Sequence, residues 1–235
     1  MNGNSLFVSF KDKDFEISMN DIKELRFSNT LKSIVFSLGF HKLIILDQIH
    51  SSYGININNT LVLSKDISMF EQQGDYLITN IKNLALIVLT ADCVPVVLYD
   101  QKQNVVGLVH AGWKGSATNI IEKVLQVMNI HYGTIIQDII VSFGPSARKC
   151  CYEVSEKFID EFTWFKRSLK AFDKRNDRWY FDNVIFLQEQ LIDFGLDEQN
   201  INKTNALCTI CNNNFCSFRR EKENAGRQVT IVALR

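Results

Sequence analysis

The sequence predicts a layered α/β (α+β) fold, a single-domain sandwich of mixed β-sheet with flanking helices. Short apolar runs of strand length alternate along the chain with stretches in which apolar residues recur at helical spacing. Hydrophobic residues make up 46% of the 235 residues, which is enough for a sizeable core. Only two prolines occur, and no Gly/Ser linker or repeat divides the chain, so we expect one domain over residues 1–235.

The strands of this fold are expected where apolar runs of five to eight residues end at turn-forming residues. The longest run is either one strand or two, because Pro95 marks an edge or a break. The first 80 residues carry the weakest pattern. The expected strands are residues 5–10, 42–46, 85–99, 105–110, 138–143 and 228–234.

Helical spacing of apolar residues occurs three times. A helix is expected over residues 117–130, with Ser116 as its N-cap. A second stripe runs over residues 154–162. The third covers residues 184–194, where Asp182 is the expected N-cap and Gly195 the residue just after the helix.

Charge and composition exclude several classes of protein. Lys and Arg together number 26, and Asp and Glu also number 26, so the formal net charge is zero. A nucleic-acid or membrane-surface binder would show a basic excess, and neither partner is expected here. No secretory signal and no apolar span of 18 residues is visible, and six cysteines are too few for a disulfide scaffold. We therefore expect a cytoplasmic protein with reduced thiols; its oligomeric state stays open.

Residues 88–115 hold the strongest functional signal. The polar stretch Thr-Ala-Asp-Cys, ending at Cys93, interrupts apolar sequence, and His110 ends the next apolar run before a glycine. His50 ends another apolar segment, and the chain has only four histidines. Three such ligands from separate segments indicate either a catalytic zinc with one open position or a Cys/His catalytic pair. Asp92, beside Cys93, would point to the opposite face of a strand, which favours a structural acceptor over a catalytic base.

The other cysteines allow several interpretations. Cys208 and Cys211 have the C-x-x-C spacing of half a zinc ribbon or of a redox pair, but no second C-x-x-C follows. The adjacent Cys150 and Cys151 would complete a site only if the fold happened to bring them there. Reduced thiols that line the pocket are the favoured interpretation for Cys208, Cys211 and Cys216.

Several motifs carry a family resemblance. TADCVPVVLYD and VVGLVHAGWKG, together with QIHSS, GPSARKCCYEV, CTICNNNFCSFRRE and GRQ, resemble the YfiH-like family, also called the polyphenol-oxidase or laccase-domain family, over roughly residues 42–235. The resemblance implies a zinc enzyme that phosphorolyses adenosine, inosine and methylthioadenosine and also deaminates adenosine. It places the metal ligands and catalytic residues at His50, Cys93 and His110, and implies one zinc per chain with a purine nucleoside and phosphate as partners.

Two departures from the family pattern concern phosphate. Lys114 stands where family members often carry Arg, and residues 20–45 show no clear copy of a basic, Gly/Ser-rich segment. Lys114, Arg219 and Arg220 are the expected phosphate contacts, but Lys lacks the bidentate geometry of Arg. We therefore expect weak phosphorolysis, with deamination retained because it needs only metal-activated water and a positioned base.

Other functions remain as alternatives. A metal-free hydrolase would use Cys93 as nucleophile and His110 as base. A copper polyphenol oxidase is disfavoured, because a trinuclear copper centre takes about eight imidazoles and the chain has four histidines. A zinc-stabilised interaction module would need a closed site with four ligands, and only three can be named.

Overall fold

A computed structural model of the chain describes residues 5–15, 17, 29–58 and 72–235. Its α-helices are α2 (Asn29–Ser37), α3 (Trp113–Ala117), α4 (Ile120–Tyr132), α5 (Asn183–Asp193) and α6 (Phe218–Glu221). Its strands are β1 (Leu6–Phe10), β2 (Lys42–Ile45), β3 (Gly54–Ile57), β4 (Tyr76–Thr79), β5 (Leu84–Thr90), β6 (Val94–Asp100), β7 (Val105–Ala111), β8 (Ile139–Phe143), β9 (Glu153–Val154), β10 (Phe172–Arg175), β11 (Arg178–Phe181), β12 (Ile201–Asn202) and β13 (Gln228–Leu234).

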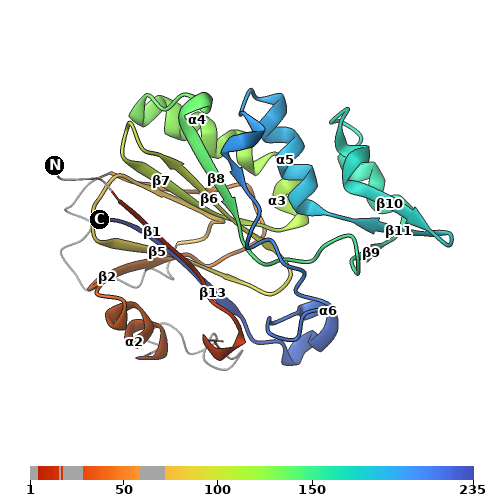
Figure 1. Cartoon of the computed structure of the whole chain (residues 1–235), viewed down its shortest axis with the longest axis horizontal. Coiled ribbons are helices and arrows are strands. Elements are labelled where there is room, and N and C mark those ends of the chain that lie inside the picture. The colour runs from red at the N-terminus through yellow and green to blue at the C-terminus, as the bar shows by residue number, and fades with distance from the viewer. Residues whose placement is uncertain (1–4, 16, 18–28, 59–71) are drawn as a thin grey trace.

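Two mixed sheets form the centre of the fold, which confirms the predicted layered sandwich. One sheet has the order β12-β8-β6-β7-β4-β3 and the other the order β1-β13-β5-β2. Aliphatic side chains such as Leu86 and Leu108 form the core between them. Helices α4 and α5 cover the outer face of the six-stranded sheet, and α2 covers that of the four-stranded sheet (Figure 1). The molecule thus has four layers.

The apolar run predicted over residues 85–99 is two strands that belong to different sheets. Strand β5 pairs with β13 and β2, whereas β6 pairs with β7 and β8. The chain crosses from one sheet to the other through residues 91–93. Pro95 is the second residue of β6, just after the break, and it does not mark a sheet edge, since β6 has a partner on each side. This crossing places Cys93 between the ends of the two sheets.

The helix predictions hold in part. Asp182 caps α5 by accepting a hydrogen bond from Ile185 N, and Gly195 follows with φ of +100°, as expected. The expectation for Ser116 is wrong. It lies inside the short helix α3, where its hydroxyl donates to Gly112 O, and α4 begins only after a left-handed Asn119. The stripe over residues 154–162 forms strand β9 followed by a 3₁₀ helix, η5 (Glu156–Phe162).

A third sheet, of order β10-β11-β9, projects from one side of the sandwich (Figure 1). A cluster of phenylalanines anchors it, with the Phe162 ring 4.7 Å from both Phe181 and Phe186 between centroids. Aromatic pairs at this spacing stabilise by about 0.5–1.5 kcal/mol beyond their area burial. No helix in the described parts of the chain is long and apolar enough to cross a bilayer.

Candidate active site

Three strand ends bring His50, Cys93 and His110 together. His50 lies in the loop after β2 with a left-handed φ of 61°, Cys93 lies in the bend between β5 and β6, and His110 lies near the end of β7. One ligand atom from each lies within 4.8 Å of the others, and the two imidazole centroids are 4.9 Å apart. The set expected from the sequence therefore lies in one place.

Asp75 holds both histidine segments in position. Its Oδ1 is 2.8 Å from His110 Nδ1 and accepts a hydrogen bond from His50 N at 3.0 Å. Its Oδ2 accepts from both the backbone N and the hydroxyl of Ser51. The bond at Nδ1 leaves Nε2 of His110 available toward the Cys93 sulphur. A carboxylate behind a histidine in this way is typical of metal sites.

Sequence reasoning missed Asp75. Its only local signal is a Gly-Asp pair, Gly74 and Asp75, directly before the buried strand β4. That signal resembles an ordinary turn. The strand pairing of β4 with β7, which carries His110, is what gives the carboxylate its role.

Cys93 and His110 stabilise each other's charged forms. Burial raises the pKa of the Cys93 thiol, but the charge and hydrogen bond of His110, and then His50, bring it down to about 6. Burial lowers the pKa of His110, whereas the Cys93 thiolate and the Asp75 carboxylate raise it to about 9. The metal-free pair is therefore a thiolate beside an imidazolium, and a metal ion would take the place of the proton.

Gly112 is needed because the backbone passes directly against the ligands. A Cβ at this position would lie 2.8 Å from His50 Cδ2 and 3.3 Å from Cys93 Sγ. At Gly115, a Cβ would lie 2.6 Å from the carbonyl oxygen of Ser51, in the segment that follows His50. Both glycines of the HAGWKG motif thus let helix α3 approach the His50 loop.

The donor set fits a zinc ion. Two imidazoles and a thiolate are ligands that zinc prefers, and three protein ligands leave a position open for substrate or water. The Asp75–His110 hydrogen bond supplies the outer partner such a histidine usually has. His110 is buried but His50 is exposed, so the open side faces solvent.

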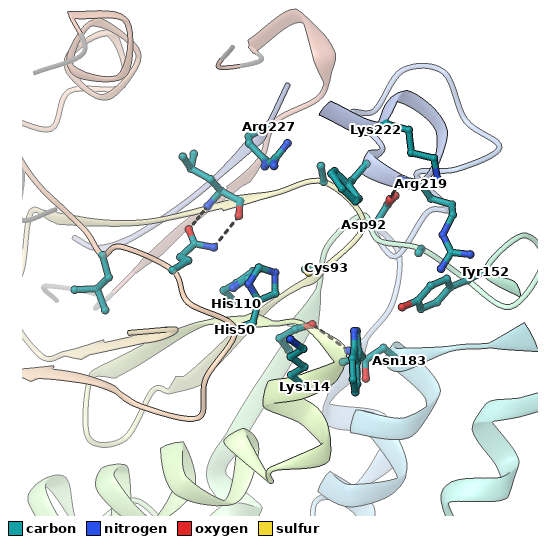
Figure 2. Close-up of a pocket in the computed structure, with 18 of the residues that line it drawn as sticks. His50, Asp92, Cys93, His110, Lys114, Tyr152, Asn183, Arg219, Lys222 and Arg227 are labelled. Carbon is teal, nitrogen blue, oxygen red and sulfur yellow. Dashed lines mark hydrogen bonds between the residues drawn. The ribbon is translucent and has the colours of Figure 1, made fainter. Parts of the chain in front are cut away.

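The ligands lie in a pocket of about 620 Å³ between the two sheet ends (Figure 2). Trp113, Tyr152 and Phe218 provide aromatic surface. Four basic residues line the pocket: Lys114 and Arg219, which the sequence predicts, and Lys222 and Arg227, which it does not. A pocket of this size, with aromatic walls and several cations, suits a small polar ligand that carries negative charge.

Arg220 has a different position from its neighbour. It does not line the pocket; its guanidinium donates to the carbonyl oxygens of Thr209 at 2.7 Å, Ile210 at 2.9 Å and Phe215 at 2.6 Å. Arg219 lies at the pocket, 4.7 Å from the Tyr152 ring centroid. Of the three expected phosphate contacts, Lys114 and Arg219 are at the pocket, and Arg220 braces a loop.

Asp92 acts as a connector between loops. It is not in a strand, and it has a left-handed φ of 86°. Its carboxylate accepts hydrogen bonds from the Thr209 hydroxyl and from Arg219 N, each at 2.6 Å. The expected role as a structural acceptor agrees with this geometry, although the reason is a bend and not the far face of a strand.

The remaining cysteines do not lie where the sequence suggests. Among them, none lines the pocket. Cys208 and Cys211 lie beside Cys150 and Cys151 in a separate cluster, and Cys216 is buried next to β13. Interpreting Cys208, Cys211 and Cys216 as pocket-lining thiols is therefore wrong, because the loops fold these side chains away from His110.

The segment that lacks the basic family motif lies only partly within the described residues. Residues 20–28 lie outside them. Residues 29–45 contain α2, which packs on the outer face of the four-stranded sheet, and β2, which is an edge strand of that sheet. None of these residues lines the pocket.

Comparison with known proteins adds a family model, two relatives and a solved structure. A family model described as multi-copper polyphenol oxidoreductase laccase matches residues 9–235. A protein of Borreliella burgdorferi named purine nucleoside phosphorylase is 39% identical over 156 residues, 65% of this chain and 66% of its own length. One of the same name from Aquifex aeolicus is 35% identical over 211 residues, 90% of this chain and 92% of its own. The crystal structure of Bacillus licheniformis hypothetical protein YfiH has a TM-score of 0.79 at 28% identity, covering 88% of this chain and 80% of that one.

Proposed function

This chain belongs to the family described as multi-copper polyphenol oxidoreductase laccase, which includes YfiH-like proteins, and from that premise we propose that it is a zinc-dependent purine nucleoside phosphorylase that also deaminates adenosine. The single observation that carries the proposal is the pocket: a His50, Cys93 and His110 set at its base, with aromatic and cationic walls. The names of the two bacterial relatives support the same activity.

Zinc is the proposed metal despite the copper in the family's description. The chain has four histidines, and the described ligand cluster contains two of them. A multicopper centre would need about eight imidazoles for its trinuclear part alone. Zinc bound by His50, Cys93 and His110 would supply Lewis-acid chemistry at the base of the pocket.

The pocket residues divide the proposed reaction into two binding tasks. In phosphorolysis, a phosphate oxygen forms a bond to C1′ of the ribose while the bond from C1′ to the purine nitrogen breaks. The base leaves with the electron pair and takes up a proton. Lys114 and Arg219 would hold the phosphate through charge-assisted hydrogen bonds, and Lys222 and Arg227 add positive charge nearby.

The nucleoside would occupy the aromatic part of the pocket. Trp113 and Tyr152 offer faces for a purine, and burial raises the pKa of Tyr152 to about 12, with the Cys93 thiolate adding to the shift. Tyr152 therefore stays a neutral hydrogen-bond donor. Asn183 is buried at the pocket wall, with Nδ2 donating to Ala111 O at 3.0 Å, while its Oδ1 has no partner among the described residues. Asn183 thus supports the end of β7, next to His110, at the pocket wall.

The test is product analysis on metal-analysed protein. Adenosine and inosine are each incubated with and without phosphate, and the products are identified by chromatography and mass spectrometry. Inosine should give hypoxanthine and ribose 1-phosphate only when phosphate is present, and adenosine should give inosine without it. Absence of both reactions in protein with zinc bound at His50, Cys93 and His110 would reject the proposal. Because Lys114 stands where family members often carry Arg, phosphorolysis should be slower than deamination. The ratio of products measures this difference.

A metal-free Cys–His hydrolase is the second candidate, because the Cys93 thiolate beside the His110 imidazolium is also the arrangement of an activated nucleophile. Metal analysis and chelation separate the two. Removal of the metal should abolish the proposed phosphorylase, and zinc should restore it, whereas a Cys–His hydrolase would keep its activity without metal.

A further inference from the structure

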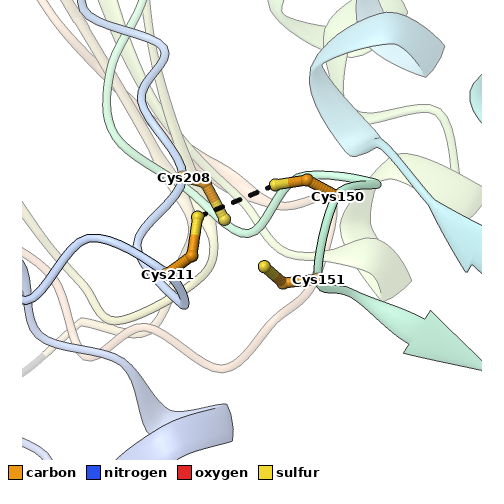
Figure 3. Close-up of side chains that lie close together, drawn as sticks. All are labelled: Cys150, Cys151, Cys208 and Cys211. Carbon is orange, nitrogen blue, oxygen red and sulfur yellow. Dashed lines mark hydrogen bonds between the residues drawn. The ribbon is translucent and has the colours of Figure 1, made fainter.

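Four cysteine thiols converge at a second place, away from the pocket floor (Figure 3). The sulphur atoms of Cys150, Cys151, Cys208 and Cys211 all lie within 4.8 Å of one another, and those of Cys150 and Cys211 are 3.9 Å apart. Four sulphurs around a tetrahedral zinc, with bonds of about 2.3 Å, lie about 3.8 Å from each other. A disulfide would need about 2.05 Å. The spacing is that of ligands around an ion and not of bonded sulphurs.

The local chain geometry aims these sulphurs inward. Adjacent side chains of a strand point to opposite faces, but Cys150 and Cys151 lie in a turn, and both sulphurs face the same centre (Figure 3). Across from them, Cys208 and Cys211 have the C-x-x-C spacing of structural zinc sites. Backbone hydrogen bonds close both turns: Cys151 N donates to Arg148 O at 3.0 Å, and Asn212 N donates to Cys208 O at 3.2 Å.

Both cysteine segments are held in place by hydrogen bonds outside the cluster. Ser146 and Cys208 form a parallel bridge, in which Ser146 N donates to Leu207 O and Thr209 N to Ser146 O, each at 3.0 Å. The Arg220 guanidinium binds carbonyl groups on both sides of Cys211. A metal ion would thus bind cysteines that the fold already holds close together, so little conformational entropy would be lost on binding.

We propose that Cys150, Cys151, Cys208 and Cys211 bind one structural zinc ion, separate from the metal at His50, Cys93 and His110. Four thiolates close the coordination shell, so this site has no position for substrate. Its role is to fix a wall of the pocket. The Cys150–Cys151 turn leads directly into Tyr152, and the C-x-x-C loop is joined through Thr209 to Asp92, beside Cys93.

Metal analysis of the full chain tests the proposal without reference to activity. Protein purified with a reductant and dialysed against zinc should contain two zinc ions per chain by mass spectrometry. Cys151→Ser and Cys211→Ser should each lower this to one, and Cys93→Ala should lose the other ion. Cys216→Ala removes a thiol outside both sites and is the matched control, with two ions expected. In Cys93→Ala loaded with cobalt, the absorption spectrum should be that of a tetrathiolate site.

A second measurement uses the unaltered protein, so it holds even if a cysteine variant does not fold. Cys211 is exposed, and as an unbound thiol it would react with N-ethylmaleimide. With zinc bound, peptide mapping should find it protected until a chelator is added. Rapid labelling before chelation, a Cys150–Cys211 disulfide in place of metal, or a single zinc that Cys93→Ala removes would each overturn the proposal. Failure of the phosphorylase assay would leave these readouts unchanged.

Discussion

The two groups of side chains that we propose to bind metal differ in ligand type, number and setting. His50, Cys93 and His110 come from three strand ends, and Asp75 supports the two histidine segments from behind. The four cysteines come from two loops, which backbone hydrogen bonds and Arg220 support. The first set leaves a ligand position that opens on a pocket, and the second can surround an ion completely. Ligand count and access to solvent thus separate a site for chemistry from a site for structure.

The largest difference is expected when one thiol is removed from each group. Cys93→Ala should lower kcat/KM for inosine phosphorolysis by more than about 100-fold, which is the most that loss of a mere supporting partner costs. Its melting temperature should stay close to that of the native protein. Cys211→Ser should instead lower the melting temperature and keep measurable turnover. Steady-state kinetics and thermal unfolding of both variants make the comparison, and the opposite assignment of effects would contradict it.

The next effect concerns the carboxylate behind the histidines. Asp75→Asn keeps the shape but weakens the hold on His110 and the His50 loop, so zinc affinity or activity should fall by about 10–100-fold. Asp100→Asn is the matched control. Asp100 is equally buried, but its carboxylate accepts hydrogen bonds from Lys102 N and Gln103 N in a turn at the far end of β6. Competition with a chromophoric chelator measures zinc affinity. Equal losses of affinity in both variants would contradict the proposal that Asp75 acts by holding His110 and the His50 loop.

The neighbouring residues Arg219 and Arg220 allow a sharper test, because Arg219 lies at the pocket and Arg220 supports a loop. Arg219→Met should raise KM for phosphate about tenfold, the worth of one charge-assisted hydrogen bond. It also removes one exposed hydrogen bond, to Glu153 O, so the free energy of unfolding should fall less than in Arg220→Met. Arg220→Met leaves three loop carbonyls without their shared donor. It should lower the free energy of unfolding by about 1–3 kcal/mol and change KM less. Phosphate saturation curves and urea denaturation give both quantities, and a KM effect larger for Arg220 would reverse the assignment.

The smallest expected effect is a pH dependence of the free energy of unfolding at Glu221, which is bonded to Arg220. Partial burial raises the pKa of Glu221, but hydrogen bonds from Lys13 and Arg220 lower it to about 2. A carboxyl with a lowered pKa stabilises the fold above its ordinary pKa of 4.5, and this contribution is lost as pH falls toward about 2. Glu221→Gln should therefore cost less than about 1 kcal/mol at pH 7 and have no cost near pH 2. Urea denaturation at several pH values measures it, with exposed Glu223→Gln as control; an undiminished cost near pH 2 would contradict the assignment.

Local sequence patterns predict much of the fold and part of the site. Strands β7, β8 and β13 and helix α5 follow from runs of apolar residues and their caps, which depend on near neighbours in the chain. The grouping of His50, Cys93 and His110 in one site follows from rare residue types near strand ends. The prediction for Ser116 is wrong because the short helix α3 includes this residue, which no local cap pattern indicates. Local rules identify elements, but they do not say where one helix ends and another begins.

The chain by itself determined the alternation of strands and helices, the ligand types and the glycines beside them, because these depend on short-range sterics and on the chemistry of single side chains. Only the tertiary structure decided which distant groups meet. The pairing of β4 with β7 places Asp75 behind His110, and the bridge at Ser146 brings Cys150 and Cys151 to Cys208 and Cys211. The tertiary structure also places Arg219 at the pocket and Arg220 against a loop, since adjacent side chains at a helix start point in different directions. Such contacts join residues far apart in the chain, such as Cys150 and Cys211, which are 61 positions apart, and no spacing in the sequence encodes them.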